Sequence, residues 1–79
     1  MVVISGNGKQ VFDSKDIIAL VVRSSLLGTE DRIYAHLRSG REILVHKDRY
    51  AWGANSEKKE YDKALKSGKQ EYQFSDWSW

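Results

Sequence analysis

The sequence predicts one small α+β domain over residues 1–79, with an antiparallel sheet of four to five strands, one C-terminal helix and an aromatic C-terminal tail. Three observations lead to this fold class. Short runs rich in β-branched residues fill the first half, a helical pattern follows them, and no change in composition divides the chain. A chain of 79 residues buries only a modest core, so a deep substrate pocket is not expected.

The chain is expected to open with a hairpin made by residues 2–5 and 9–12. The segment Gly6-Asn7-Gly8 lies between them, and glycine adopts positive φ angles at little cost. A phosphate-binding loop would need a helix after the motif G-x-x-x-x-G-K-[ST], whereas a β-favouring run follows here. The segment is therefore predicted to be a hairpin turn.

Residues 17–23 are predicted to form the central strand of the sheet. Their apolar residues do not alternate with polar ones, as in a strand that is covered on both faces. The loop that follows contains Leu26 and Leu27. These two side chains are expected either to fold back onto the core or to contact a partner.

A second hairpin is predicted for residues 32–37 and 41–47, with the three-residue loop Arg38-Ser39-Gly40 between them. This loop gives one strongly apolar face and one mixed face, whereas a shift by one residue would mix the two. The predicted pairs are Leu37 with Arg41, Ala35 with Ile43, Ile33 with Val45, His36 with Glu42, and His46 with Arg32.

A helix is predicted for residues 56–66. Asn55 or Ser56 can cap its first turn, and Gly68 is a typical C-terminal stop. The tail, residues 70–79, is expected to be either a last strand or an extended arm.

The aromatic residues are concentrated near the C-terminus. Residues 50–79 contain seven of the nine aromatic residues in the chain. Tryptophan and tyrosine dominate the binding energy of many protein interfaces. The alternative is that the tail folds back over the sheet as part of the core. The predicted partner-binding residues are Trp52, Tyr72, Trp77 and Trp79, with Leu26 and Leu27 as a second patch.

The charge is only mildly basic, because 13 Lys and Arg face 11 Asp and Glu, giving +2 and a pI near 9.0. A protein that coats DNA would usually carry a larger excess. The second hairpin is nevertheless locally basic, and a basic sheet face with an aromatic residue is one way to hold single strands. The residues predicted for this nucleic-acid-binding alternative are Arg32, Tyr34, Arg38, Arg41 and Lys47.

Neither catalytic nor metal-binding residues are predicted. The chain has no cysteine, which excludes disulfides and thiolate chemistry. His36 opposite Glu42 is more simply a cross-strand polar pair than an acid–base pair. No cofactor is expected. No apolar run is long enough to span a bilayer and the N-terminus lacks signal-peptide features, so a cytoplasmic location is predicted.

The predicted function is that of a small non-enzymatic protein-binding module in the cytoplasm. An inhibitor or adaptor that blocks a partner protein's surface fits this size, and a viral protein, encoded by a phage or mobile element, is one expected origin. Nucleic-acid binding by the second hairpin is the alternative. A third hypothesis is a homodimer, in which a second copy covers the mixed face around Tyr34 and Leu44.

Overall fold

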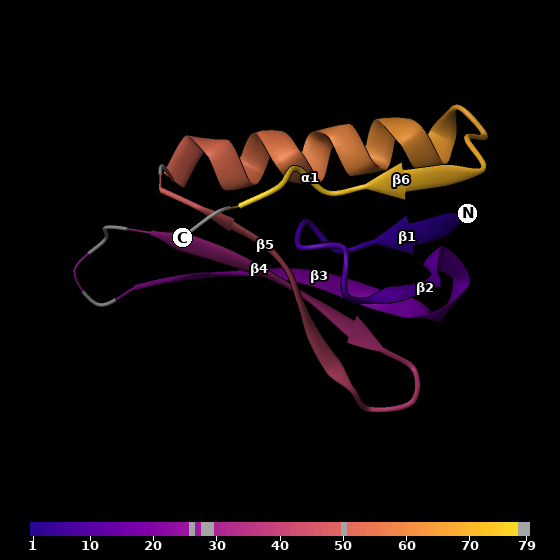
Figure 1. Cartoon of the computed structure of the whole chain (residues 1–79), viewed down its shortest axis with the longest axis horizontal. Helices are drawn as coiled ribbons and strands as arrows, with labels where there is room; N and C mark the ends of the chain where they lie inside the picture. Colours follow the sequence, from indigo (N-terminus) through magenta and orange to yellow (C-terminus); the bar gives the residue numbers. More distant parts are fainter. Residues whose placement is uncertain (26, 28–29, 50, 78–79) are drawn as a thin grey trace.

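The computed structural model describes residues 1–25, 27, 30–49 and 51–77, without the side chains of residues 51 and 52. The predicted α+β class is confirmed, but these residues form six strands in two sheets rather than one sheet of four to five (Figure 1). The strand orders are β2-β1-β6 and β3-β4-β5. The elements in chain order are β1 (Val2–Ile4), β2 (Val11–Asp13), the 3-10 helix η1 (Ser14–Asp16), β3 (Ile17–Ser24), β4 (Asp31–Leu37), β5 (Glu42–Asp48), α1 (Ala51–Lys66) and β6 (Glu71–Gln73).

The opening hairpin forms as predicted, except that its second strand begins at Val11 instead of residue 9. Hydrogen bonds to polar side chains in the turn explain why this strand begins later than predicted. The amide of Lys9 donates to Asn7 Oδ1 at 3.0 Å, and the amide of Gln10 donates to Ser5 Oγ at 3.0 Å. These two amides are thereby held within the turn. Gly8 has φ +74°, which supports the predicted turn.

The prediction that residues 17–23 form the central strand is wrong, because β3 lies at the edge of its sheet. β4 pairs with β3 on one side and with β5 on the other, so the three consecutive strands form a meander. Only one face of β3 packs on the core, through Leu20 and Val22. Ile18 lies at an irregularity in the register and is 61% exposed. The apolar residues of β3 therefore belong to a strand that has one face covered by the core and one edge without a partner strand among the described residues.

The second hairpin confirms most of the predicted register. Leu37 donates its amide to Arg41 O at 2.9 Å, and Ala35 pairs with Ile43. The predicted pair of Ile33 with Val45 is wrong, because a β-bulge places His46 opposite Ile33. His46 therefore leaves the mixed face, where it was expected opposite Arg32, and is 3% exposed.

The helix begins at Ala51, five residues before the predicted start at residue 56. The carboxylate of Asp48 lies against Gly53 in the first turn, where any side chain would overlap it. A negative charge beside a helix N-terminus is favourable. The end at Lys66 is as predicted, because Gly68 has φ +74° and donates its amide to Leu65 O at 3.3 Å.

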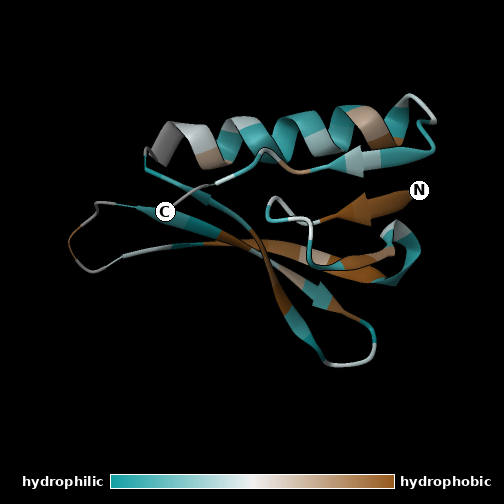
Figure 2. Cartoon of the chain, viewed as in Figure 1, coloured by the Kyte–Doolittle hydropathy of each residue, from teal (hydrophilic) through white to brown (hydrophobic). Residues whose placement is uncertain are grey.

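The core lies between α1, the β2-β1-β6 sheet and one face of the β3-β4-β5 sheet (Figures 1 and 2). The tail contributes a strand, β6, which runs parallel to β1, with Val3 opposite Tyr72. Phe74 follows this strand and is only 1% exposed. Its ring stacks on Tyr61 of α1 at 5.7 Å between centroids. Of the two alternatives for the tail, a last strand is thus the one observed for residues 71–73.

Replacing Phe74 with alanine is expected to lower the free energy of unfolding by about 3–5 kcal/mol, because it leaves a cavity in the core. Urea denaturation measures this loss. Gln73→Ala is the matched control, since Gln73 directly precedes Phe74 and its side chain is exposed. The milder variant Phe74→Leu keeps the comparison possible if the alanine variant does not fold. Equal losses for Phe74→Leu and Gln73→Ala would contradict the buried position.

Candidate functional site

Of the six predicted partner-binding residues, three have described side chains, and these differ in how exposed they are. Leu26, Trp79 and the side chain of Trp52 lie outside the described residues. Leu27 is 86% exposed, whereas Tyr72 and Trp77 are half-buried. Of the six, Leu27 is therefore the described side chain that lies mainly in solvent.

The C-terminal segment is bound to α1 through a buried carboxylate. Glu57 is 8% exposed and accepts three hydrogen bonds. The donors are the Ser75 amide at 2.6 Å, the Ser75 hydroxyl at 3.0 Å and the Tyr72 hydroxyl at 3.0 Å. Burial, and after it the charge of Glu57, raises the pKa of Tyr72 far above its ordinary value. Tyr72 therefore holds the fold together rather than offering its hydroxyl to a partner.

Another buried polar group is His46, which contacts the same segment. Its Nδ1 lies 2.8 Å from Ser75 O, and its Nε2 lies 3.2 Å from Asp48 Oδ2. Each ring nitrogen thus lies beside an oxygen atom that can accept a hydrogen bond. Trp77 meets this ring edge-on at 6.3 Å. Both ring nitrogens of His46 are thus in contact with other parts of the chain, one with the C-terminal segment and one with Asp48.

The nucleic-acid-binding alternative involves the outer face of the β3-β4-β5 sheet, which points away from the core. The structure brings Arg32, Tyr34 and Lys47 together on this face, since Arg32 is opposite Lys47 and two residues from Tyr34. Arg38 and Arg41 lie instead at the end of the hairpin. Arg38 donates from Nε to the carbonyl of Lys15 at 3.0 Å.

Both arginines on the outer face have acidic partners within the chain. Arg23 forms a two-pronged ion pair with Glu42 at 2.6 and 3.0 Å, and Arg32 contacts Glu30 at 2.9 Å. A hydrogen bond with Tyr34 and the neighbouring Glu30 raise the pKa of Arg32 above its ordinary value. The guanidinium of Arg23 also covers the ring of Tyr34, 4.8 Å from its centroid. A base would have to displace it in order to stack there.

A different feature, the open edge of β3, was not predicted from the sequence. Among the described residues, no strand pairs with the side of β3 opposite to β4. In β4, Leu37 bonds to β5, so the alternate residues, including Tyr34 and His36, bond to β3. Their partners on β3 are Val21 and Ala19. The backbone groups of Leu20 and Val22 consequently point toward the open edge.

A groove of about 370 Å³ runs beside this edge, between β3 and α1. Its apolar lining includes Ile18, which is 61% exposed, and Leu65, which is 46% exposed. Tyr61, which is 4% exposed, also lines it. The full lining is Ser14, Ile17, Ile18, Ala19, Leu20, Lys58, Tyr61, Asp62 and Leu65. We refer to the β3 edge with these residues as the edge groove.

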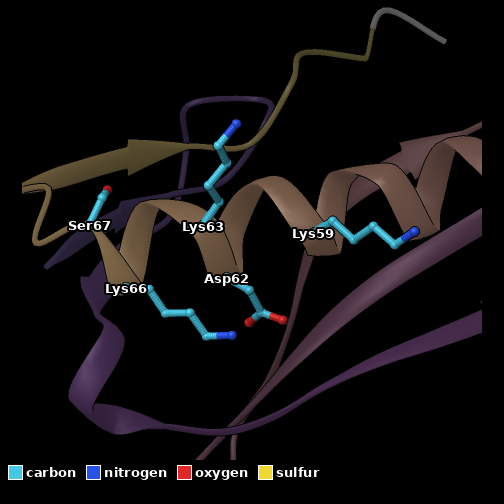
Figure 3. A pocket seen from close by; sticks show the side chains of 5 residues that line it. All are labelled: Lys59, Asp62, Lys63, Lys66 and Ser67. Atoms are coloured by element: carbon cyan, nitrogen blue, oxygen red, sulfur yellow. The ribbon is translucent and has the colours of Figure 1, made fainter.

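The α1 side of the edge groove carries one positive and one negative charge. Lys58 and Asp62 line it, and Asp62 also borders an adjoining hollow of about 570 Å³. The other residues of that hollow are Lys59, Lys63, Lys66 and Ser67. Figure 3 shows Lys59, Asp62 and Lys66 pointing to one side of the helix, and Lys63 pointing to the other. The helix therefore contributes Lys58 and Asp62 to the edge groove, whereas the other lysines line the adjoining hollow.

No protein-family model matches the chain, and neither the curated proteins nor the solved structures give a match. Among the described residues, no group of three His, Asp or Glu side chains could hold a metal ion. Within the same part of the chain, no helix has the length and apolar character needed to cross a membrane.

Replacing Glu57 with glutamine is expected to lower the free energy of unfolding by roughly 1.5–3 kcal/mol, the range for hydrogen bonds to charged groups. The amide group of glutamine presents a donor where Ser75 and Tyr72 already donate. Thermal and urea denaturation measure the loss. Glu60→Gln is the control, since Glu60 lies exposed one turn further along α1. Equal stability of the two variants would contradict the described contacts.

High pH is expected to destabilise the protein through Tyr61 and Tyr72. Burial raises the pKa of both hydroxyls above the ordinary value of 10.0. The unfolded chain therefore loses these protons first, so stability is fully present below about pH 10 and falls above it. Ultraviolet titration of the four tyrosines should show ionisation that coincides with unfolding followed by circular dichroism. Complete ionisation near pH 10 in the folded protein would contradict this.

Proposed function

We propose that this chain is a non-enzymatic protein-binding module that takes up an extended segment of a partner protein as an additional strand on β3. The observation that carries the proposal is the open edge of an eight-residue, largely apolar strand beside a groove. In this binding mode the backbone supplies affinity and the neighbouring pockets supply specificity.

The composition of β3 supports this role, because proteins usually protect such an edge. Common devices are short edge strands, lysine, proline or a covering loop. β3 has no charged residue between Ile17 and Val22, and the chain contains no proline. Its length of eight residues exceeds the usual five to six. The edge thus retains the features that favour pairing.

The geometry of the edge groove also supports strand addition. Leu20 and Val22 present their backbone groups to the position of a new strand, and such a strand would lie about 4.8 Å from β3. On the core side it would cover Ile18 and Leu65, the exposed apolar residues of the groove. An inhibitor or adaptor, the roles predicted from the sequence, would act by occupying this partner segment.

The other surfaces receive less support from the geometry. Of the residues predicted for an aromatic docking surface, Tyr72 is engaged with α1 through its hydrogen bond to Glu57. On the outer face, ion pairs occupy Arg23 and Arg32, so phosphate contacts would first have to break them. A second copy on the outer face would have to cover the same ion pairs around Tyr34. The cytoplasmic and viral assignments stay predictions.

Blocking the edge is expected to abolish binding of extended peptides. The ligands would be selected from a displayed library of random peptides, and their binding site would be mapped by amide chemical shifts. Val22→Pro removes a backbone N–H that points toward the open edge, a position where proline is tolerated. We expect shifts centred on β3, and loss of binding by at least about tenfold, the equivalent of one hydrogen-bonded contact.

Val22→Ala is the matched control, because it loses a similar side chain and keeps the N–H. It should retain binding, and circular dichroism should show that both variants are folded. If Val22→Pro does not fold, a synthetic chain with an N-methylated Val22 amide removes the same donor. Peptides that shift the outer face, or that bind Val22→Pro as tightly as the parent chain, would overturn the proposal.

A further inference from the structure

We propose that two copies of this chain pair through β3, so that each copy supplies the strand that occupies the edge groove of the other. This inference rests on the proposed function, because it uses the same strand addition, and it names a second copy as the partner. A segment of another protein would then bind by displacing that copy.

β3 is itself a segment of the kind that its own edge accepts. It is eight residues long, and residues 17–22 carry no charge. In an antiparallel pair of β3 strands, the backbone groups of Leu20 in both copies point toward the interface. The three strands of each copy would form one sheet of six, a common size. Because β3 is already ordered in the fold, this pairing costs less entropy than the ordering of a free peptide.

The antiparallel arrangement determines the symmetry of such a pair. A continuous antiparallel sheet has a two-fold axis perpendicular to it, between the two β3 strands. Because α1 lies along the sheet, the axis keeps both helices on one side of it and makes them run in opposite directions (Figure 1). The edge groove lies along residues 17–20 of β3 and between Lys58 and Leu65 of α1. An axis through its middle therefore passes close to Ala19.

The charges of the edge groove are complementary to themselves under this axis. α1 contributes one lysine, Lys58, and one aspartate, Asp62, which lies one turn further along. Because the two helices run in opposite directions, Lys58 of each copy lies on the side of Asp62 of the other. An isologous interface forms each such contact twice. A lining with charges of one sign would repel its own copy, whereas this lining attracts it.

The same pairing would cover the exposed apolar residues of the edge groove. Ile18 is 61% exposed and Leu65 is 46% exposed. Around an axis near Ala19, Ile18 of one copy lies opposite Leu20 of the other and meets apolar groups. Arg23, the charged residue of β3, lies near the far end of the strand, so the two Arg23 side chains stay apart. A second copy thus matches both the apolar and the charged residues of the groove.

The first test is the oligomeric state of the full chain, measured by sedimentation velocity over a range of concentrations. We expect a dimer that dissociates on dilution. A synthetic chain with an N-methylated Leu20 amide loses one donor at the interface and keeps every side chain. It should raise the dissociation constant at least about tenfold, the equivalent of one hydrogen-bonded contact, relative to the unmodified synthetic chain. Circular dichroism should show that both chains are folded.

The second test reverses the charges of the groove one at a time. Lys58→Glu and Asp62→Lys each place like charges across the axis, and each should weaken its own dimer by roughly three- to tenfold, the range for two exposed ion pairs. A mixture of the two variants restores both contacts, because opposite charges again face each other. Energy transfer between labelled copies should therefore show that mixed dimers form in preference to dimers of either variant.

The control mixture combines Lys69→Glu with Glu60→Lys. These variants make the same charge changes, but the two residues line another hollow, beside Tyr72, and not the edge groove. They should dimerise like the parent chain and show no preference for mixed dimers. An equal preference in this mixture would reveal a general charge effect and overturn the inference.

The outcomes separate this inference from the proposed function. If the chain stays monomeric at every concentration while selected peptides shift the β3 amides, the second copy is wrong and strand addition stands. If the chain dimerises and the N-methylated Leu20 leaves the dissociation constant unchanged, the copies meet through another surface and the inference is overturned. If the chain is monomeric and no peptide shifts the β3 amides, both proposals fail.

Discussion

The buried face of β4 is the constraint on which the rest of the structure depends. Ile33 and Ala35 are fully buried on it and Leu37 is 7% exposed, so three consecutive inward positions must be covered. β3 and β5 pair on either side of this strand, and α1 lies over its inner face with Phe74. A chain of 79 residues has few residues left to cover other surfaces once this face is covered. The outer face and the far edge of β3 remain uncovered among the described residues as a direct consequence.

The β-bulge at Val45 links the two sheets. It turns both Val45 and His46 toward the core, at 0% and 3% exposure. The carbonyl of Val45 accepts the Gly6 amide at 2.8 Å, and the ring of His46 contacts Ser75 O. Without the bulge, His46 would point outward, and Ser75 would lose one of the two buried side chains that form hydrogen bonds with it. The other of these side chains is Glu57, so the bulge in β5 and a residue of α1 together hold the C-terminal segment in place.

Local patterns in the sequence were enough to predict the elements but not how they pack. The alternation in β4 and the loop at Gly40 predicted the second hairpin, and Gly68 predicted the end of α1, because these signals act within a few residues. The central position assigned to β3 was wrong, since an apolar run does not show which edge its neighbours occupy. The bulge depends on contacts with Gly6 and Ser75, far away in the chain. The edge groove forms because α1 packs beside β3, and such packing cannot be predicted from local patterns. The sequence shows only some of its apolar residues, such as Ile18 and Leu65.

The uncovered edge of β3 also determines which binding properties we expect of the edge groove. The backbone of β3 can pair with any extended segment, so it supplies affinity without selecting a sequence. Selection must then come from side chains around the groove, and on α1 these are Lys58, Tyr61, Asp62 and Leu65. Exposed charges contribute little to affinity individually, but they speed association and exclude partners of like charge. A free strand edge that would otherwise pair with any chain is thereby restricted to segments whose side chains fit the groove beside it.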